Sequence, residues 1–168
     1  SFSDVTPTVG GTGAWVTPYV MHPTTNTTLF AGYKDVYKTT NSGSTWSAIS
    51  SNLTGGSTTL KSLAVAPSNA SVIYAASYTK IYKTTTGASP WSTITGTLPV
   101  ASASITYIAV HPTDPQTVYV TFSGYSSGKK VYKSTDGGTT WTNISGTLPN
   151  LPVNCITVED NGYDALYV

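Results

Sequence analysis

The chain has 168 residues, only 9% of them are charged, and its formal net charge is +1. This balance creates no long-range field that would gather phosphate groups or acidic lipids, which argues against a nucleic-acid partner. All eight basic residues are lysines. The sequence has no apolar run of about 18 residues and no basic leader followed by an apolar stretch, so it predicts neither membrane insertion nor a signal peptide.

In chain order, residues 1–13 look like the trailing edge of a repeating unit, and copies of that unit follow. Each copy contains two apolar runs, an aliphatic-Tyr-Lys triplet and a loop that ends in Trp. The first copy has these segments at 19–23, 29–31, 36–38 and 39–46; the second at 63–67, 72–76, 81–83 and 84–91; the third at 108–112, 118–122, 131–133 and 134–141. A last copy shows only the two apolar runs, at 156–160 and 166–168.

The loop tryptophans give the length of the repeat. Trp46 and Trp91 are 45 positions apart, and Trp91 and Trp141 are 50 apart, a period typical of stacked or radial supersecondary units. The runs are short, rich in Val, Ile and Tyr, and separated by Gly, Pro, Asn, Asp and Ser clusters, which predicts strands joined by tight turns.

Four antiparallel strands per unit predict an all-β fold, a segment of a β-propeller with about 3.6 blades. We expect the chain to be an excerpt of a larger propeller; assembly of short chains into a ring is the alternative. The predicted limits are 1–13 for the trailing edge of a preceding blade, then blades at 14–58, 59–102 and 103–151, and the start of a further blade at 152–168.

The apolar pattern predicts how the strands are buried. In Val118–Phe122 apolar side chains alternate with Tyr119 and Thr121, which predicts a half-buried strand. The first run of each unit is apolar at consecutive positions, as in Ile108–Val110, so we expect this strand to be innermost and covered on both faces. Cys155, the only cysteine, is interpreted as a small buried hydrophobe on a strand.

The third loop, 134–141, has the composition of a tight hairpin. Asp136 can accept backbone N–H groups within its own turn, Gly137 and Gly138 tolerate positive φ, and Thr140 can tie the loop with its hydroxyl. The bulky Trp141 is then expected to anchor the hairpin by burial. We therefore interpret the loop as structural rather than catalytic.

This loop matches the Asp-box, also called the bacterial neuraminidase repeat, whose pattern is Ser/Thr-x-Asp-x-Gly-x-Thr-Trp/Phe. The resemblance implies structural roles for Ser134, Asp136, Gly138, Thr140 and Trp141. The first loop keeps the equivalent Gly43, Thr45 and Trp46 but has Asn41 for Asp; the second keeps Trp91 but has Thr86 and Pro90 for Asp and Thr. These departures argue against identical turns in the first two loops.

Proteins that share this hairpin include sialidases, xyloglucan-degrading glycoside hydrolases and sortilin-type receptors. The units look most like the sortilin-like repeats of secreted type IX cargo in Bacteroidetes bacteria, whose usual role is that of a rigid surface for protein or glycan contacts. The resemblance therefore implies the fold more firmly than the function.

Two kinds of glycosidase site can be compared with the acidic and basic residues of this chain. Sialidases hold the substrate carboxylate with three arginines and pair a Tyr with a Glu, whereas this chain has no arginine and one glutamate, Glu159; a complete sialidase site is therefore excluded. A xyloglucanase-like site needs two carboxylates facing each other across a cleft. Asp35, between the second and third strands, is a weak candidate with no identifiable partner, so we predict no catalytic residue and no cofactor.

The remaining candidates concern binding. Tyr33, Asp35, Tyr78 and Tyr125 lie in or near loops between second and third strands and form a candidate ligand rim, although each tyrosine is more simply a half-buried sheet residue. His22 and His111 occupy equivalent places before a Pro, and we expect them to pack in turns rather than bind a metal.

These observations favour a noncatalytic, secreted or cell-surface propeller segment that acts as a scaffold or interaction module for protein or glycan. Its other expected partner is the rest of a larger propeller, or further copies that complete the ring. The alternative is a fragment of a xyloglucanase-like glycoside hydrolase whose active site lies mostly outside these residues.

Overall fold

The structure is a computed structural model that describes residues 5–7, 11–160, 162 and 164–168. Part of the predicted trailing edge, residues 1–4 and 8–10, lies outside the described residues. Every regular element of the described part is a β-strand. Within that part, no helix is long and apolar enough to cross a lipid bilayer.

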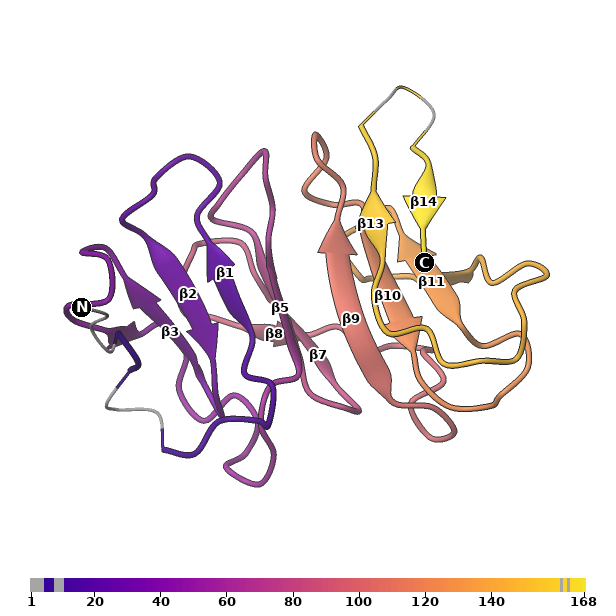
Figure 1. Cartoon of the computed structure of the whole chain (residues 1–168), viewed down its shortest axis with the longest axis horizontal. Coiled ribbons are helices and arrows are strands. Elements are labelled where there is room, and N and C mark those ends of the chain that lie inside the picture. Colours follow the sequence, from indigo (N-terminus) through magenta and orange to yellow (C-terminus); the bar gives the residue numbers. More distant parts are fainter. Residues whose placement is uncertain (1–4, 8–10, 161, 163) are drawn as a thin grey trace.

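The strands form three four-stranded antiparallel sheets and one two-stranded sheet (Figure 1). The first sheet comprises β1 (Tyr19–Met21), β2 (Leu29–Gly32), β3 (Val36–Thr39) and β4 (Ser47–Ala48). The second comprises β5 (Ser62–Val65), β6 (Ile73–Ala76), β7 (Ile81–Thr84) and β8 (Ser92–Thr93). The third comprises β9 (Ile105–Val110), β10 (Val118–Phe122), β11 (Val131–Ser134) and β12 (Thr142–Asn143), and the last comprises β13 (Thr157–Val158) and β14 (Leu166–Tyr167).

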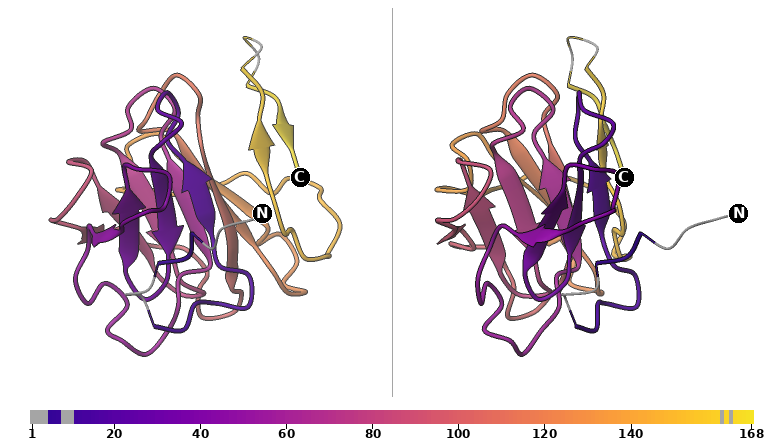
Figure 2. Two further views of the ribbon diagram at one scale, coloured as in Figure 1. Left: turned by 60° about the vertical axis from the view of Figure 1, so that its left-hand side comes forward. Right: turned by 90° about the vertical axis from the view of Figure 1, so that its left-hand side faces the viewer.

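Each four-stranded sheet is a simple meander in which consecutive strands pair. Contacts between sheets are concentrated on the first strand of each: β1 contacts β5, β5 contacts β9, and β9 contacts β13. The sheets therefore fan out from their first strands, and Figure 2 shows the β13–β14 hairpin at the edge of the array. The predicted fold, an all-β propeller segment of four-stranded blades, is confirmed, and the exact blade limits stay predictions.

The core is divided into three apolar clusters, one at each contact between successive sheets. The β10 strand joins two of them, because Val118, Val120 and Phe122 pack toward the second sheet while Tyr119 packs with Ile156 near the last sheet. All five residues of β10 are buried. The predicted alternation is correct, but the half-buried strand is wrong, since a neighbouring sheet covers each face.

The first strands β1 and β9 are less covered than the sequence predicts, whereas the first strand β5 is buried at Ser62, Leu63 and Val65. Tyr19 and Met21 of β1 are exposed, and so is Tyr107 of β9, whereas the second strands β6 and β10 are buried throughout. The first strands lie at the inner edge of the sheets, where successive sheets contact each other. Cys155 is also exposed, just before β13, so its predicted burial on a strand is wrong.

The repeated Tyr-Lys pair has a structural explanation. Its lysine lies directly across from an aromatic residue of the second strand in the three pairs Lys38–Phe30, Lys83–Tyr74 and Lys133–Tyr119. The ammonium nitrogen is 5.6, 5.6 and 5.4 Å from the respective ring centre. Each pair is a cation–π contact worth about 0.5–1 kcal/mol.

Candidate functional site

The Asp-box loop of the third sheet is closed by its own side chains. Ser134 Oγ donates to Asp136 Oδ1 at 2.7 Å and accepts from the Gly138 N–H at 2.8 Å. Asp136 in turn accepts from the backbone N–H and the hydroxyl of Thr140, at 2.8 and 2.6 Å. These bonds, that of the Thr140 hydroxyl first, lower the pKa of Asp136 to about 2.

The first loop keeps this geometry although Asn41 stands in place of the aspartate. Asn41 Oδ1 accepts from the Thr39 hydroxyl and from the Thr45 N–H, each at 2.9 Å, and the Gly43 N–H donates to Thr39 Oγ1 at 3.0 Å. The Asn41 amide donates to Thr45 Oγ1, reversing the hydrogen-bond direction used by Asp136. The two turns are therefore closely alike, despite the departure in sequence.

The second loop is built differently. The hydroxyls of Thr84 and Thr86 both donate to the Ala88 carbonyl, and the Ser89–Pro90 peptide bond is cis. Neither these hydrogen bonds nor the cis peptide bond has a counterpart in the other two loops. This difference agrees with the residues Thr86 and Pro90, which replace the Asp and Thr of the Asp-box pattern.

The loop tryptophans connect neighbouring sheets. The indole N–H of Trp91 donates to the Ile49 carbonyl, and that of Trp141 to the Ile94 carbonyl, each at 2.9 Å. Trp46 makes the same bond to Val5, also at 2.9 Å. Ile49 and Ile94 directly follow the last strand of the preceding sheet, so each indole fastens its hairpin to the unit before it.

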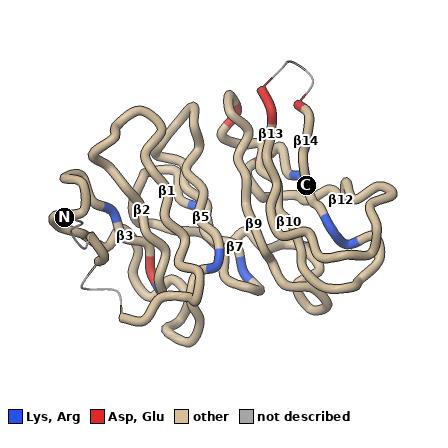
Figure 3. The backbone as a smooth tube through the Cα atoms, in the orientation of Figure 1, with Lys and Arg blue, Asp and Glu red and all other residues tan. Residues whose placement is uncertain are grey.

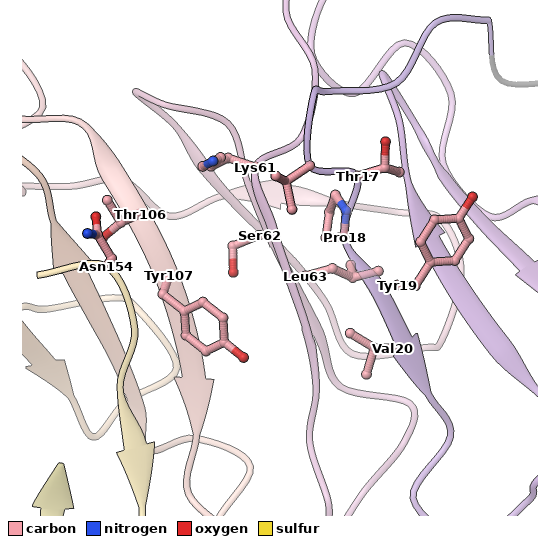
Figure 4. A pocket seen from close by; sticks show the side chains of 11 residues that line it. Thr17, Pro18, Tyr19, Val20, Lys61, Ser62, Leu63, Thr106, Tyr107 and Asn154 are labelled. Atoms are coloured by element: carbon pink, nitrogen blue, oxygen red, sulfur yellow. The ribbon is translucent and has the colours of Figure 1, made fainter. Parts of the chain in front are cut away.

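The candidate binding site is a groove of about 490 Å³ at the mouth formed by the starts of the first strands, hereafter the mouth groove. Its lining combines apolar and aromatic side chains with a few polar groups: Val16, Thr17, Pro18, Tyr19, Val20, Lys61, Ser62, Leu63, Thr106, Tyr107 and Asn154. Figure 4 shows Lys61, Ser62 and Tyr107 around the space between β5 and β9, with Leu63 on the side of β1. Such a mixture suits an extended ligand with apolar groups.

Charges are unevenly distributed along the strand direction, although Asp35 lies at the lysine-rich end and Lys38, Lys83 and Lys133 lie within the third strands. Lysines gather at the end where the mouth groove lies, on the starts of first strands and the hairpins between second and third strands: Lys34, Lys61, Lys80, Lys129 and Lys130. The loops at the other end carry most of the acidic residues, namely Asp114, Asp136, Glu159, Asp160 and Asp164. Figure 3 shows the acidic β9–β10 and β13–β14 loops together at that end, and none of the residues lining the groove is acidic.

The predicted ligand rim divides into buried and exposed members. Tyr33 is only 4% exposed and its hydroxyl lies 2.7 Å from that of Tyr19, so its side chain is not available to a ligand. Tyr78 and Tyr125 are 46% and 73% exposed. Lys61 extends over the Tyr78 ring with its nitrogen 5.9 Å from the ring centre, which connects Tyr78 to the mouth groove.

Asp35, the candidate carboxylate, ties a loop together. It accepts from the Ser50 hydroxyl at 2.6 Å and from the backbone N–H groups of Asn52 and Leu53 at 3.1 and 2.9 Å. It is not among the residues that line the mouth groove. The Asp35 carboxylate therefore stabilises the loop that contains Ser50, Asn52 and Leu53.

Comparison with known families identifies the repeat. A family model described as "Sortilin, neurotensin receptor 3" matches residues 34–155, a range that contains all three Trp-ending loops. The chain belongs to the Sortilin-Vps10 family. The predicted resemblance to sortilin-like repeats is thereby confirmed, and no curated protein sequence matches the chain.

Solved structures similar to this Sortilin-Vps10 chain are β-propellers. The GH74 enzyme of Niastella koreensis is 21% identical with a TM-score of 0.62, over 79% of this chain and 22% of that one. The GH74 xyloglucanase of Xanthomonas campestris is 17% identical with a TM-score of 0.65, over 86% and 25%. YCF48 bound to D1 peptide is 18% identical with a TM-score of 0.52, over 75% and 43%. The chain thus spans less than half of each, and these likenesses show the fold alone.

The mouth groove of the Sortilin-Vps10 chain was missed in the sequence. The predicted rim includes neither Tyr107 nor Lys61, and it also leaves out Trp15, which directly precedes the groove residue Val16 and is fully exposed. The sequence nevertheless contains a signal for the groove, because the residues just before the first apolar run of each unit must lie together at the centre of a propeller. The predicted rim lies instead at the hairpins between the second and third strands.

The histidines lie in turns. In His22 the Nδ1 atom accepts from the Thr24 N–H, and in His111 it accepts from the N–H groups of Thr113 and Asp114, each at 3.3 Å. His111 Nε2 is 2.8 Å from Asp164 Oδ1, which connects the third sheet to the β13–β14 loop. Among the described residues, no group of three or more His, Cys, Asp or Glu could hold a metal ion.

Proposed function

We propose that the chain is a noncatalytic interaction module of a larger secreted or cell-surface propeller, and that its mouth groove binds a segment of a protein or glycan. The observation that carries the proposal is the chemistry of the groove: exposed aromatic and aliphatic groups with one lysine and no carboxylate. Aromatic side chains with a polar tip are the groups that dominate recognition surfaces.

The lack of an acid–base pair in the groove supports a noncatalytic role. Glycoside hydrolysis uses two carboxyl groups on opposite sides of the scissile bond. Asp35 is held by three loop hydrogen bonds, and Asp136 is held by its hairpin. Neither carboxylate lines the groove.

The test is a binding and hydrolysis screen of the purified chain against a glycan array, a peptide library and xyloglucan. We expect binding without turnover. Tyr107→Ala should weaken the binding at least about tenfold, as loss of an aromatic anchor does. Leu151→Ala is the matched control, because Leu151 is 57% exposed and does not line the groove.

The second candidate is a fragment of a xyloglucanase-like glycoside hydrolase, favoured by the fold shared with GH74 enzymes. Turnover of xyloglucan that is lost in Asp35→Asn would establish this candidate and overturn our proposal. Binding that Tyr107→Ala leaves unchanged would show that the mouth groove is not the site.

A further inference from the structure

The contact between the first and second sheets differs at its outer edge from the contact between the second and third. Between the second and third sheets, a Cβ atom added at Gly138 would be 2.4 Å from Ile94 Cδ1, and one added at Gly96 would be 3.4 Å from Trp141. Both glycines let the third loop lie directly on the second sheet. Ala88 and Ser51 hold the equivalent positions in the first contact.

An open cleft, hereafter the interblade cleft, lies between the first and second sheets beside Ser51 and Ala88. It consists of two adjoining hollows of about 220 and 450 Å³ that share Ser51 and Ser89. The first is also lined by Asn52, Leu53, Tyr82, Trp91 and Thr93, and the second by Ala48, Ile49, Ser50 and Ala88. The volume of the larger hollow alone is in the range of ligand sites, which measure about 300–1,000 Å³.

The lining of the interblade cleft is polar but carries no charged side chain. Ser51, Asn52 and Thr93 are exposed, and within the described part of the chain their side chains make no hydrogen bond. Hydroxyl and amide groups both donate and accept hydrogen bonds. Trp91 stands beside them as a partly buried aromatic wall whose indole N–H is already used by Ile49.

We propose that the interblade cleft binds a neutral saccharide. Sugar hydroxyls also donate and accept, so they match the free groups of Ser51, Asn52 and Thr93. The Trp91 ring offers an apolar surface to the C–H face of a sugar ring. The uncharged lining excludes a charge-based preference for an acidic or phosphorylated ligand.

A peptide fits this cleft less well. A bound peptide strand would need a sheet edge to extend, and the nearest edge strands, β4 and β8, have two residues each. The apolar side chains of a peptide would also need pockets, whereas the partly buried Leu53 and Trp91 are the main apolar walls of the smaller hollow.

The test uses the complete 168-residue chain, an array of neutral β-glucan and xyloglucan oligosaccharides, and calorimetric titration of the hits. The variant Ser51→Ala/Asn52→Gly/Thr93→Val removes the three free groups; glycine suits position 52, where φ is +53°. We expect it to weaken saccharide binding at least about tenfold with an unchanged melting temperature. The matched control is Thr97→Ala/Thr147→Ala, which removes exposed hydroxyls at the positions equivalent to Asn52 in the next two sheets, and should bind like the parent.

Three outcomes would overturn the inference: no binding across the array, binding that the triple variant retains, or binding of a random hexapeptide library at the cleft instead. The site is separate from the mouth groove, so the two proposals can fail separately. Binding that is lost in Tyr107→Ala but retained in the triple variant would support the mouth groove and reject the interblade cleft.

Discussion

At the scale of single residues, the geometry of the Asp-box turn depends on an oxygen atom in the right place, and a negative charge on that oxygen adds stability without being required for the turn. Asp136 and Asn41 both use Oδ1 to accept a threonine N–H, and both are joined by a hydroxyl two residues earlier. The amide of Asn41 reverses one bond, to Thr45, without changing the turn. The sequence could predict a turn role for Asp136, but a pattern that requires Asp understates the equivalence of Asn41.

This equivalence gives a prediction for Asp136. Asp136→Asn should keep the turn but lose the contribution of the ionised carboxylate, so it should lower the melting temperature at pH 7 by less than Asp136→Ala does. Asp136→Ala should lower it by about 2–4 °C, since it removes the hydrogen bonds that close the loop. The pKa of Asp136 is lowered to about 2 in the fold, against about 3.9 when unfolded. Its ionised form therefore stabilises the protein fully above about pH 4, and this contribution is lost as the pH falls toward about 2.

Thermal melts from pH 7 to pH 2 check this prediction. Asp136→Asn should flatten the part of the pH dependence below about pH 4 that comes from this group. An asparagine variant as unstable as the alanine variant at neutral pH would contradict the view that the side-chain oxygen alone is enough to form the turn.

At the scale of the strands, local patterns predict where strands occur better than how deeply they are buried. The alternation in Val118–Phe122 correctly assigns the two faces, yet Tyr119 and Thr121 are as buried as the valines. A sequence pattern cannot show that a second sheet covers the polar face. For the same reason, the interblade cleft near Ala88 was not predicted, because it depends on how closely two sheets approach.

The approach of sheets can be tested at Gly138. This residue has a φ of +93° and no room for a Cβ next to Ile94, whereas Gly146 has a φ of +53° and no atom within 4 Å of an added Cβ. Gly146→Ala should therefore cost only the conformational strain, about 1–2 kcal/mol. Gly138→Ala adds a clash between sheets and should cost about 2–5 kcal/mol in the free energy of unfolding.

Chemical denaturation of the two variants measures the difference. Equal losses would mean that the third loop can move away from the second sheet without cost. A larger loss for Gly138→Ala would show that the glycine of the Asp-box serves contact with the neighbouring blade.

At the scale of the molecule, the described part of the chain is a linear array in which the main contacts between sheets join neighbouring units. Regularly spaced tryptophans together with the apolar runs between them predict the repeat and the fold class, because each repeat must bury its faces against the next. The bonds that join the units, from Trp91 to Ile49 and from Trp141 to Ile94, were not predictable. They cross between loops and strand ends that are 42 and 47 residues apart.

In an array of this kind, removing one hydrogen bond between neighbouring sheets should have mainly local effects. Trp141→Phe removes the bond to the Ile94 carbonyl and should cost about 1–3 kcal/mol, while Trp15→Phe, at a fully exposed position, should change stability by less than about 0.5 kcal/mol. The amides of Ile49, Ile94 and Ile144 make equivalent bonds within successive sheets, so their hydrogen exchange reports each unit separately. If stability is a sum of blades and nearest-neighbour contacts, Trp141→Phe accelerates exchange at Ile94 and Ile144 more than at Ile49. Equal acceleration at all three amides would instead mean that the blades unfold together and that the indole bond stabilises the whole segment.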